Sequence, residues 1–368
     1  MPRPLSIGLL TPCYWPEVRR GTERFTHDLA SGLALDGHRA RIITTHPGRW
    51  SHCTENGLAI VRLPRPPESA LTRRGFERYI GHAPLSYATL RWTRPDVAQA
   101  MYATDAIAAA RYARASGRPS IYSYMGIPED WWVRRRRLRM RMTGRAVQRC
   151  DAVVALSRAA AAAFGSTFGV EARVIAPGVD LAAFTPGGER APEPTIFCPA
   201  AIAEPAKQVP ELLRAFARVR RIRPDARLVL SRPADPALAA SVLADAPGVT
   251  LADVDDRARL RDAYRRAWVT ALPSVGEAFG LVLVESLACG TPVLGRARGG
   301  IPDIIDRDTV GALFEGDEEA LARALLSTLD LHADPGTARA CRERAADFST
   351  VSCVRAYESL YRELLADC

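Results

Sequence analysis

The sequence predicts an α/β protein built from two doubly wound domains, each with a parallel sheet between layers of helices. Short apolar runs of strand length alternate with amphipathic helical segments along the chain. A polar segment rich in proline and glycine, at 185–194, divides the chain into two similar halves. With 368 residues the chain is also too long for one compact unit, so two domains are expected.

The first half begins with the strand, loop, helix, strand order of a doubly wound sheet. A buried strand is expected at 4–10, and a loop with two prolines follows it. A helix then starts near Thr22 and ends at Gly37, before a second strand at 39–44. Its apolar face comprises Phe25, Leu29 and Leu33. The same alternation predicts strands at 60–63, 96–99, 120–124, 152–156 and 174–176, and a helix at 104–116.

The second half repeats this alternation after the linker, so it predicts a second sheet of the same kind. Strands are expected at 195–198, 227–230, 249–251, 268–273 and 292–294. Helices are expected at 209–222, 260–267, 281–289, 318–329, 338–346 and 351–365. The last of these helices is amphipathic and therefore needs a partner surface.

The stretch from 273 to 294 is the strongest candidate for a functional site. Two carboxylates, Glu277 and Glu285, flank the start of a helix that follows a small, polar loop. Gly280 permits close approach of a ligand to the backbone, and the free amides of a helix start suit a phosphate. In the alternative interpretation Glu277 is a solvated loop acid and Glu285 an acid favoured near a helix start.

The residues in this stretch read Pro-Ser-x-x-Glu-x-Phe-Gly-Leu-x-x-x-Glu-x-x-Ala-x-Gly-x-Pro-Val. This pattern, with its Glu-x7-Glu spacing, resembles the signature of retaining glycosyltransferases of family four, also described as glycosyl transferases group 1. The similarity continues through the Gly-Gly-Ile-Pro-Asp run at 299–303 and Gly-Ala-Leu-Phe at 311–314. It covers more than forty contiguous positions, which makes it specific.

The resemblance implies the GT-B fold, in which two Rossmann-like domains face each other across a crevice. Residues 1–184 would form the acceptor domain and residues 185–350 the domain that binds the nucleotide-sugar donor. The helix at 351–368 would cross back and pack on the first domain.

The resemblance also implies roles for individual residues. Glu277 and Lys207 would be catalytic, with Glu277 orienting the sugar and Lys207 meeting the diphosphate. Glu285 would bind the ribose of the donor. The other donor-binding positions would be Phe279, Gly280, Leu281, Val282 and Gly21.

Three positions depart from the family pattern. Arg20 stands where the family has the first of two glycines, and Met125 stands where it often has a histidine that contacts the transferred sugar. The family arginine that accompanies the lysine is missing, since Ala201 and Ile202 occupy its place. These departures favour the alternative of a catalytically silent protein that binds a nucleotide sugar. A third reading is a glycoside phosphorylase of the same fold.

Composition limits the partners. The eight cysteines form no Cys-x-x-Cys pair, and the six histidines have no metal-ligand spacing, so no metal and no cofactor are expected. No run resembles a signal peptide or a membrane span, which predicts a cytoplasmic protein. Cys13, beside Tyr14 and Trp15, is expected to be a packed thiol rather than a nucleophile.

The formal net charge of +9 suits an anionic ligand or membrane surface. Two tryptophans and a run of arginines at 131–145 could form a peripheral contact with the cytoplasmic face of a membrane. The alternative is a helix with solvated arginines and with Leu138, Met142 and Val147 inward.

The function expected from the sequence is transfer of a sugar, with retention and without a metal, from a UDP-sugar or a GDP-sugar to a hydroxyl group. The acceptor would be a small molecule or lipid-linked, and no nucleic acid is expected as a partner.

Overall fold

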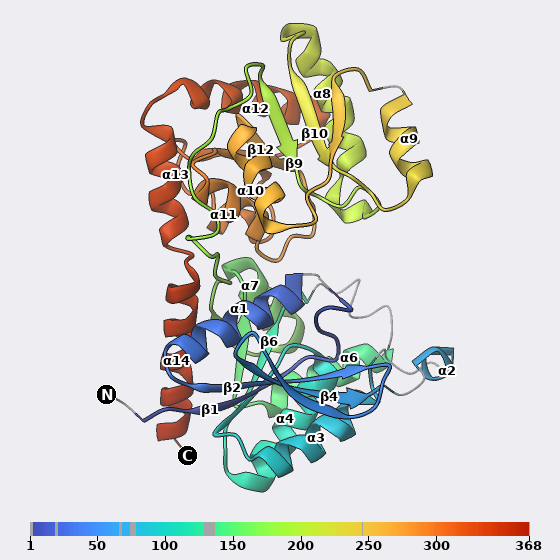
Figure 1. The fold of residues 1–368 in the computed structure, drawn as a ribbon, viewed down its shortest axis with the longest axis vertical. Helices are drawn as coiled ribbons and strands as arrows, with labels where there is room; N and C mark the ends of the chain where they lie inside the picture. Colours follow the sequence, from blue (N-terminus) through green and yellow to red (C-terminus); the bar gives the residue numbers. More distant parts are fainter. Residues whose placement is uncertain are drawn as a thin grey trace. The chain divides into compact units, whose positions relative to one another are not determined.

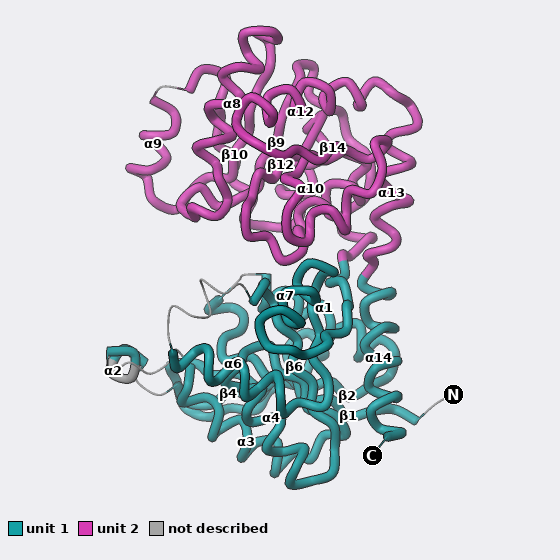
Figure 2. Tube along the Cα trace, turned by 180° about the vertical axis from the view of Figure 1, so that it is seen from behind, with its two compact units in different colours: residues 1–178, 350–368 teal, residues 179–349 magenta. Residues whose placement is uncertain are grey.

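The computed structural model describes residues 3–18, 21–65, 68–73, 79–128, 137–244 and 246–367. The chain divides into two compact units (Figure 2). Unit 1 comprises Met1–Gly178 and Thr350–Cys368, and unit 2 comprises Val179–Ser349. The domain limits expected from the sequence lie six residues and one residue from these two boundaries.

Unit 1 contains an eight-stranded sheet in the order β3-β4-β2-β1-β5-β6-β7-β8 (Figure 1). All neighbouring strands pair in parallel except β3 and β4, which form an antiparallel hairpin at one edge. The strands are β1 (Ser6–Leu10), β2 (Arg39–His46), β3 (Ser51–Glu55), β4 (Leu58–Pro64), β5 (Val97–Ala100), β6 (Ser120–Tyr124), β7 (Ala152–Ala155) and β8 (Arg173–Val174).

Helices cover both faces of this sheet, because successive strand residues point to opposite sides. Ile7 and Leu9 of β1 belong to one buried cluster, and Leu10 belongs to the other. The first cluster includes α1 and α14, and the second includes α3, α4 and α6. The helices of unit 1 are α1 (Gly21–Leu35), α2 (Glu68–Arg73), α3 (His82–Thr93), α4 (Ala103–Ser116), α6 (Arg137–Arg149), α7 (Arg158–Phe168) and α14 (Thr350–Ala366).

The C-terminal helix α14 belongs to unit 1 although the whole of unit 2 separates it in sequence from the other elements of that unit. Its Tyr357 hydroxyl donates to Ser123 Oγ at 3.1 Å, and its Tyr361 hydroxyl donates to Gln99 Oε1. The Tyr357 ring also packs against Phe25 of α1, with 6.0 Å between centroids. The apolar face of the last helix is therefore buried on the first unit.

Unit 2 contains a six-stranded sheet in the order β11-β10-β9-β12-β13-β14, and all its pairs are parallel. The strands are β9 (Thr195–Cys198), β10 (Arg227–Ser231), β11 (Val249–Ala252), β12 (Val269–Leu272), β13 (Val293–Arg296) and β14 (Gly311–Phe314). The helices are η1 (Pro205–Lys207), α8 (Val209–Ile222), α9 (Pro236–Ala244), α10 (Arg257–Arg266), α11 (Leu281–Ala288), η2 (Ile301–Asp303), α12 (Glu318–Asp330), η3 (Leu331–Ala333) and α13 (Thr337–Ala346). The predicted fold class of two doubly wound α/β domains is confirmed.

Several elements had no counterpart in the sequence prediction, among them β3, α3, α7 and α9. Strand β3 is mostly exposed, so it carries no apolar alternation. Its turn did carry a signal, since Asn56 and Gly57 adopt φ values of 50° and 80°, which suit a tight hairpin. Helix α7 buries only Ala160 and Phe164, so it has few large apolar residues that could mark a buried face.

Candidate functional site

Three loops of unit 2 meet at the carboxyl edge of its sheet. They follow β9, β12 and β13, which are adjacent and parallel, so their carboxyl ends share one edge. Backbone hydrogen bonds join the loops directly. Val275 N donates to Ala206 O at 2.9 Å, and Gly300 N donates to Glu277 O at 2.9 Å. The backbone of each loop therefore fixes the position of its neighbour.

Lys207 and Glu277 form an ion pair between two of these loops. Lys207 Nζ lies 2.8 Å from Glu277 Oε2, and both side chains are partly buried, with exposures of 26% and 18%. Burial by itself lowers the pKa of Lys207, but the charge of Glu277 and the hydrogen bond to it raise that pKa, and the net direction is upward. Lys207 is therefore a fixed cation beside a carboxylate at the sheet edge.

The backbone after Glu277 prepares the start of α11. Gly280 has a φ of 112°, a conformation that residues with a side chain rarely adopt, and it caps the helix. Phe279 is buried and its ring lies 5.3 Å from that of Phe348. The first amides of α11, at Leu281 and Val282, have no acceptor within the helix and carry the positive end of its dipole. This helix start can thus accept an anion close to the loop that holds Glu277.

Gly300 fits under the loop that carries Glu277 because it has no side chain. A Cβ at Gly300 would lie 2.4 Å from Ala278 O and 2.6 Å from Phe279 Cα, and both of these are backbone atoms that cannot rotate away. The absence of a side chain at Gly300 is therefore a packing requirement of the site.

We expect Gly300→Ala to lower the free energy of unfolding by about 1–3 kcal/mol, because the methyl group must displace backbone. Urea unfolding measures this change. Gly276→Ala is the matched control in the same loop, since a Cβ there would meet nothing within 4 Å. Equal destabilisation by the two substitutions would contradict the packing role of Gly300.

Glu285 lies on the second turn of α11 and is fully buried. Its Oε2 accepts a hydrogen bond of 2.9 Å from the hydroxyl of Tyr264, a buried residue of α10. No local pattern pointed to this tyrosine, because 21 residues separate it from Glu285. The contact with a ribose that the resemblance implies for Glu285 remains a prediction.

Arg296 is a further charged residue that sequence reasoning missed. It ends β13, and its guanidinium donates to Pro273 O at 3.1 Å and to Gly316 O at 2.9 Å. It also pairs with Glu211, in the first turn of α8. Arg296 therefore ties the loop after β12 to its neighbours. Among the described residues it does not replace the family arginine near Ile202, since its donors already have partners.

Unit 1 presents its own carboxyl edge. Gly21 begins α1, and a Cβ there would meet nothing within 4 Å, so the backbone at this helix start is open. The departure at Arg20 lies outside the described residues. Met125 packs against the apolar cluster of β1, α1 and α14, so it offers no hydrogen bond where the family has a histidine.

A cavity of about 370 Å³ lies at the ends of β1 and β2 in unit 1. Tyr14 and Trp15 contribute aromatic surface. Arg62 and Glu17 also line the cavity, and the guanidinium of Arg62 already donates to both carboxylate oxygens of Glu55. The Tyr14 hydroxyl lies 2.7 Å from His27 Nδ1, and the Trp15 ring stacks on His27 with 4.3 Å between centroids. An aromatic wall with polar groups beside it suits a polar ring that carries hydroxyl groups.

Cys13 lies close to this cavity but is buried. Burial and a hydrogen bond to Glu23 raise the pKa of the thiol to about 11. The thiol is therefore protonated at neutral pH, in agreement with a packed rather than a nucleophilic cysteine.

The basic segment at 131–145 is only partly described, since residues 131–136 lie outside the description. The remainder forms α6, in which Met142, Ala146 and Val147 are buried and the arginines lie toward solvent or at intermediate depth. Within the described chain, no helix is both long enough and apolar enough to cross a membrane.

Two protein families have models that match the chain. Residues 19–183 match the model of Glycosyltransferase Family 4, and residues 193–330 match that of Glycosyl transferases group 1. The D-inositol 3-phosphate glycosyltransferase of Mycobacterium sp. (strain JLS) is 39% identical over 194 residues, which cover 48% of this chain and 43% of that protein. The enzyme of the same name from Mycolicibacterium vanbaalenii is 36% identical over 217 residues, which cover 53% of this chain and 48% of that protein. The matched region thus spans about half the length of these relatives.

Solved structures share the fold over nearly the whole chain. Sucrose-phosphate synthase from Thermosynechococcus elongatus has a TM-score of 0.81 and 21% identity, covering 98% of this chain and 99% of that one. Anabaena HepE, solved with UDP and glucose, has a TM-score of 0.73 and 17% identity, covering 97% of this chain and 99% of that one. At these identities the likeness concerns the fold.

Proposed function

Because this chain belongs to glycosyltransferase family 4 and is a glycosyltransferase of the GT-B type, we propose that it transfers a sugar from a nucleotide diphosphate sugar to a hydroxyl group of an acceptor. The donor is a UDP-sugar in preference to a GDP-sugar. Transfer retains the configuration of the sugar and needs no metal ion. The observation that carries the proposal is the Lys207–Glu277 pair beside the start of α11.

The diphosphate of the donor is assigned to Lys207 and to the amides of Leu281 and Val282. A lysine cation and the positive end of a helix dipole both stabilise a phosphate. Because Ile202 stands near the place of the family arginine, Lys207 and these two amides must stabilise the negative charge of the diphosphate without that second cation. Since they supply positive charge without a metal, the proposal requires no metal ion.

The sugar is assigned to Glu277, and the ribose to Glu285. A carboxylate accepts hydrogen bonds from two hydroxyl groups, which matches a sugar or a ribose diol. A ribose can reach Glu285 only if the buried Tyr264 contact opens or is shared, because that hydroxyl already donates to its carboxylate.

The proposed reaction exchanges one bond at the anomeric carbon for another. The bond between that carbon and the diphosphate oxygen breaks, and negative charge grows on the phosphate beside Lys207. The acceptor hydroxyl oxygen bonds to the same face of the carbon, and its proton passes to the departing phosphate. Fixed positive groups at the leaving oxygen lower the barrier most, because charge develops there.

The acceptor is assigned to unit 1, with the cavity beside Tyr14 and Trp15 as its binding surface. The relatives named above act on an inositol 3-phosphate, a polyol that carries a phosphate. The polyol ring fits the aromatic wall, and its phosphate would replace Glu55 as the partner of Arg62. A lipid-linked acceptor, reached through membrane contact of the basic segment at 131–145, is the other acceptor class within the proposal.

Nucleotide binding and product formation test this function together. We expect UDP at a hundred times its dissociation constant to stabilise the protein by about 2.7 kcal/mol, measured as a thermal shift, and GDP to stabilise it less at the same concentration. Incubation with UDP-sugars and phosphorylated polyols should then yield a glycoside with the anomeric configuration of the donor. Absence of any nucleotide-dependent shift would refute the donor assignment.

Glu285→Ala should weaken UDP binding by about 1.5–3 kcal/mol, since a charged hydrogen-bond partner of the ribose is lost. Calorimetry with UDP measures this. Tyr264→Phe removes the tyrosine hydroxyl that bonds to Glu285 and leaves the carboxylate in place. It therefore distinguishes the loss of this hydrogen bond from the loss of the contact between Glu285 and the ribose. Unchanged UDP affinity in a folded Glu285→Ala variant would remove Glu285 from the donor site.

A further inference from the structure

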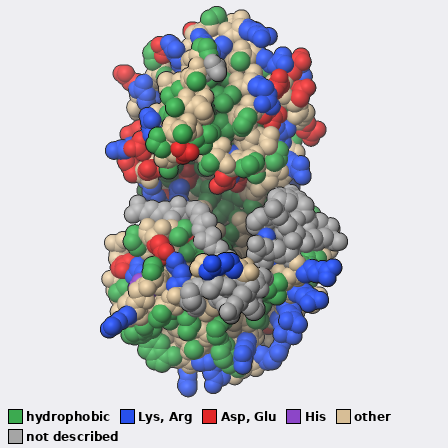
Figure 3. All heavy atoms as spheres, turned by 90° about the vertical axis from the view of Figure 1, so that its right-hand side faces the viewer, with side chains coloured by type: hydrophobic (Ala, Val, Ile, Leu, Met, Phe, Trp, Pro, Cys, Tyr) green, Lys and Arg blue, Asp and Glu red, His purple; other side chains and the backbone are tan. Residues whose placement is uncertain are grey.

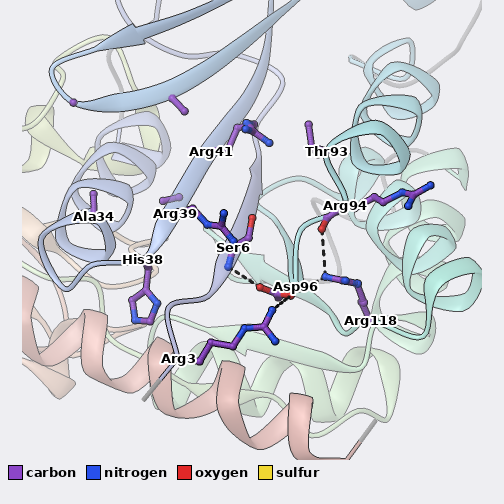
Figure 4. Close-up of a pocket in the computed structure, with 13 residues that line it drawn as sticks. Arg3, Ser6, Ala34, His38, Arg39, Arg41, Thr93, Arg94, Asp96 and Arg118 are labelled. Carbon is purple, nitrogen blue, oxygen red and sulfur yellow. Dashed lines mark hydrogen bonds and ion pairs between the residues drawn. The ribbon is translucent and has the colours of Figure 1, made fainter. Parts of the chain in front are cut away.

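A second cavity, of about 510 Å³, opens at the amino ends of β1 and β2 in unit 1 (Figure 4). Ser6 begins β1, Arg39 begins β2, and Asp96 directly precedes β5. Doubly wound sheets bind their ligands at the opposite, carboxyl edge. This cavity is therefore separate from the surfaces assigned above to donor and acceptor.

Positive charge dominates the lining of this cavity. Its charged residues, apart from His38, are the cations Arg3, Arg39, Arg41, Arg94 and Arg118 and the single acid Asp96. In Figure 4 the side chains of Arg3, Arg39 and Arg118 point toward Asp96, whereas that of Arg94 points away. Figure 3 shows further basic side chains, which in this unit are all arginines, along the lower edge of unit 1 on another face.

Asp96 cannot neutralise this group of arginines. Its Oδ2 already accepts from Ser6 N at 2.9 Å, and its Oδ1 accepts from Arg118 at 2.8 Å and lies 3.5 Å from Arg3. One carboxylate thus offsets one positive charge and is shared by two guanidinium groups. The cavity keeps a net positive charge.

Arg39 and Arg41 contribute charge without a counter-ion. Within the described part of the chain, neither guanidinium has an acidic or hydrogen-bond partner, and the Nε of Arg41 is buried. A buried donor without an acceptor is destabilising, so such donors in native proteins call for an unseen partner. An anion in the cavity would supply that acceptor.

The strand and helix residues between the arginines leave space for a ligand. Small side chains, or none, line the cavity at Ala34, Ala40, Gly57 and Ala59. The volume lies within the range of sites that bind small molecules. The amino edge of the unit 1 sheet therefore combines positive charge with space for a ligand.

We propose that this cavity binds a small phosphate-bearing anion, held mainly by Arg39 and Arg41 with Arg3 and Arg118. Several guanidinium groups around one hollow match the many acceptor oxygens of a phosphate or diphosphate better than the two of a carboxylate. The phosphate belongs either to a soluble metabolite or to a lipid headgroup. Both present the same group to the arginines.

Calorimetry with pyrophosphate, at constant ionic strength and in the presence of saturating UDP, tests the proposal, because UDP occupies the donor site. We expect wild type to bind pyrophosphate under these conditions. Arg41→Ala and Arg39→Ala should each weaken that binding tenfold or more. Arg355→Ala removes an exposed arginine of α14 that does not line the cavity, and it should leave binding unchanged.

Arg39 is exposed, so its variant should fold even if Arg41→Ala does not. Sedimentation with phosphatidylglycerol vesicles provides the second arm. If the wild type binds vesicles but not pyrophosphate, and Arg39→Ala abolishes the vesicle binding, then the phosphate belongs to a lipid headgroup. Loss of pyrophosphate binding when UDP is added, together with no vesicle binding, overturns the proposal. So does equal binding by wild type and both cavity variants. If UDP itself does not bind, the donor assignment is refuted. The cavity proposal is then tested by comparing pyrophosphate binding of wild type, Arg39→Ala and Arg41→Ala without UDP.

Discussion

Replacement of Glu277 by alanine should reduce sugar transfer by a factor of 100 or more, while UDP affinity stays within about threefold of wild type. The loss corresponds to about 2.7 kcal/mol of transition-state stabilisation. Glu277 is assigned to the sugar and lies on the loop that precedes the start of α11, which is assigned to the phosphate. Its removal would take away the carboxylate proposed to orient the sugar and also the partner of Lys207.

Steady-state kinetics with the best UDP-sugar, together with UDP calorimetry, measure the effect of Glu277→Ala. Retained UDP affinity shows that the variant is folded and that its donor site is intact. Glu277→Gln keeps the shape of the side chain and loses its charge, so its rate should lie between those of wild type and alanine variant. If Glu277→Ala transfers sugar as fast as wild type, the assignment of this loop to the sugar is wrong.

Replacement of Lys207 by alanine should lower kcat by a factor of about 100–1,000, with a smaller effect on KM. Removal of one fixed donor to a developing negative charge has an effect of this size. The binding contribution should be smaller, because the phosphate gains charge only as the bond to the sugar breaks. An increase in KM at constant kcat would mean that Lys207 binds substrate and transition state equally.

Arg214→Ala is the matched control for Lys207→Ala, since it removes a cation that pairs with a glutamate in the same unit but lies 60% exposed on α8. It should leave kcat unchanged. A double variant of Lys207 and Glu277 should lose less than the product of the single losses, because the two side chains contact each other.

The pH dependence follows from the direction of the shift at Lys207. Its folded-state pKa lies above the ordinary lysine value, so the ammonium is charged at all lower pH values and loses its charge only as pH rises through that elevated pKa. The stabilisation from the pair is therefore complete at neutral pH. The rate should show no loss from Lys207 deprotonation between about pH 6 and 9.

The features that were predicted from the sequence depend on preferences that act between residues close together in the chain. Apolar runs of strand length, helix faces such as Phe25, Leu29 and Leu33, and the glycine at 280 are visible in short windows of sequence. Local backbone sterics and solvent exclusion decide these features, so the alternation, the fold class and the loop before α11 could be predicted. Mostly exposed or alanine-rich elements, such as β3 and α7, could not, because burial leaves no pattern in them.

The arrangement of side chains from distant segments had to come from the tertiary structure. The ion pair joins residues 70 positions apart, and Gly300 supports a loop more than twenty positions before it. Tyr264 reaches Glu285, and Tyr361 of the last helix reaches Gln99 in β5. The arginine cavity likewise collects arginines from three places along the chain, namely Arg3, the pair Arg39 and Arg41 on β2, and Arg118.

The reason is physical. A sequence pattern shows which face of an element is buried and where the chain turns, because those preferences act between near neighbours. Which strands become adjacent, and in what register, depends on the packing of all the elements together. The sequence by itself thus determined the two sheets and the identity of the acids at the loop. Strand order in the folded chain decided that Lys207 faces Glu277 in unit 2 and that several arginines gather at the amino edge of the sheet in unit 1.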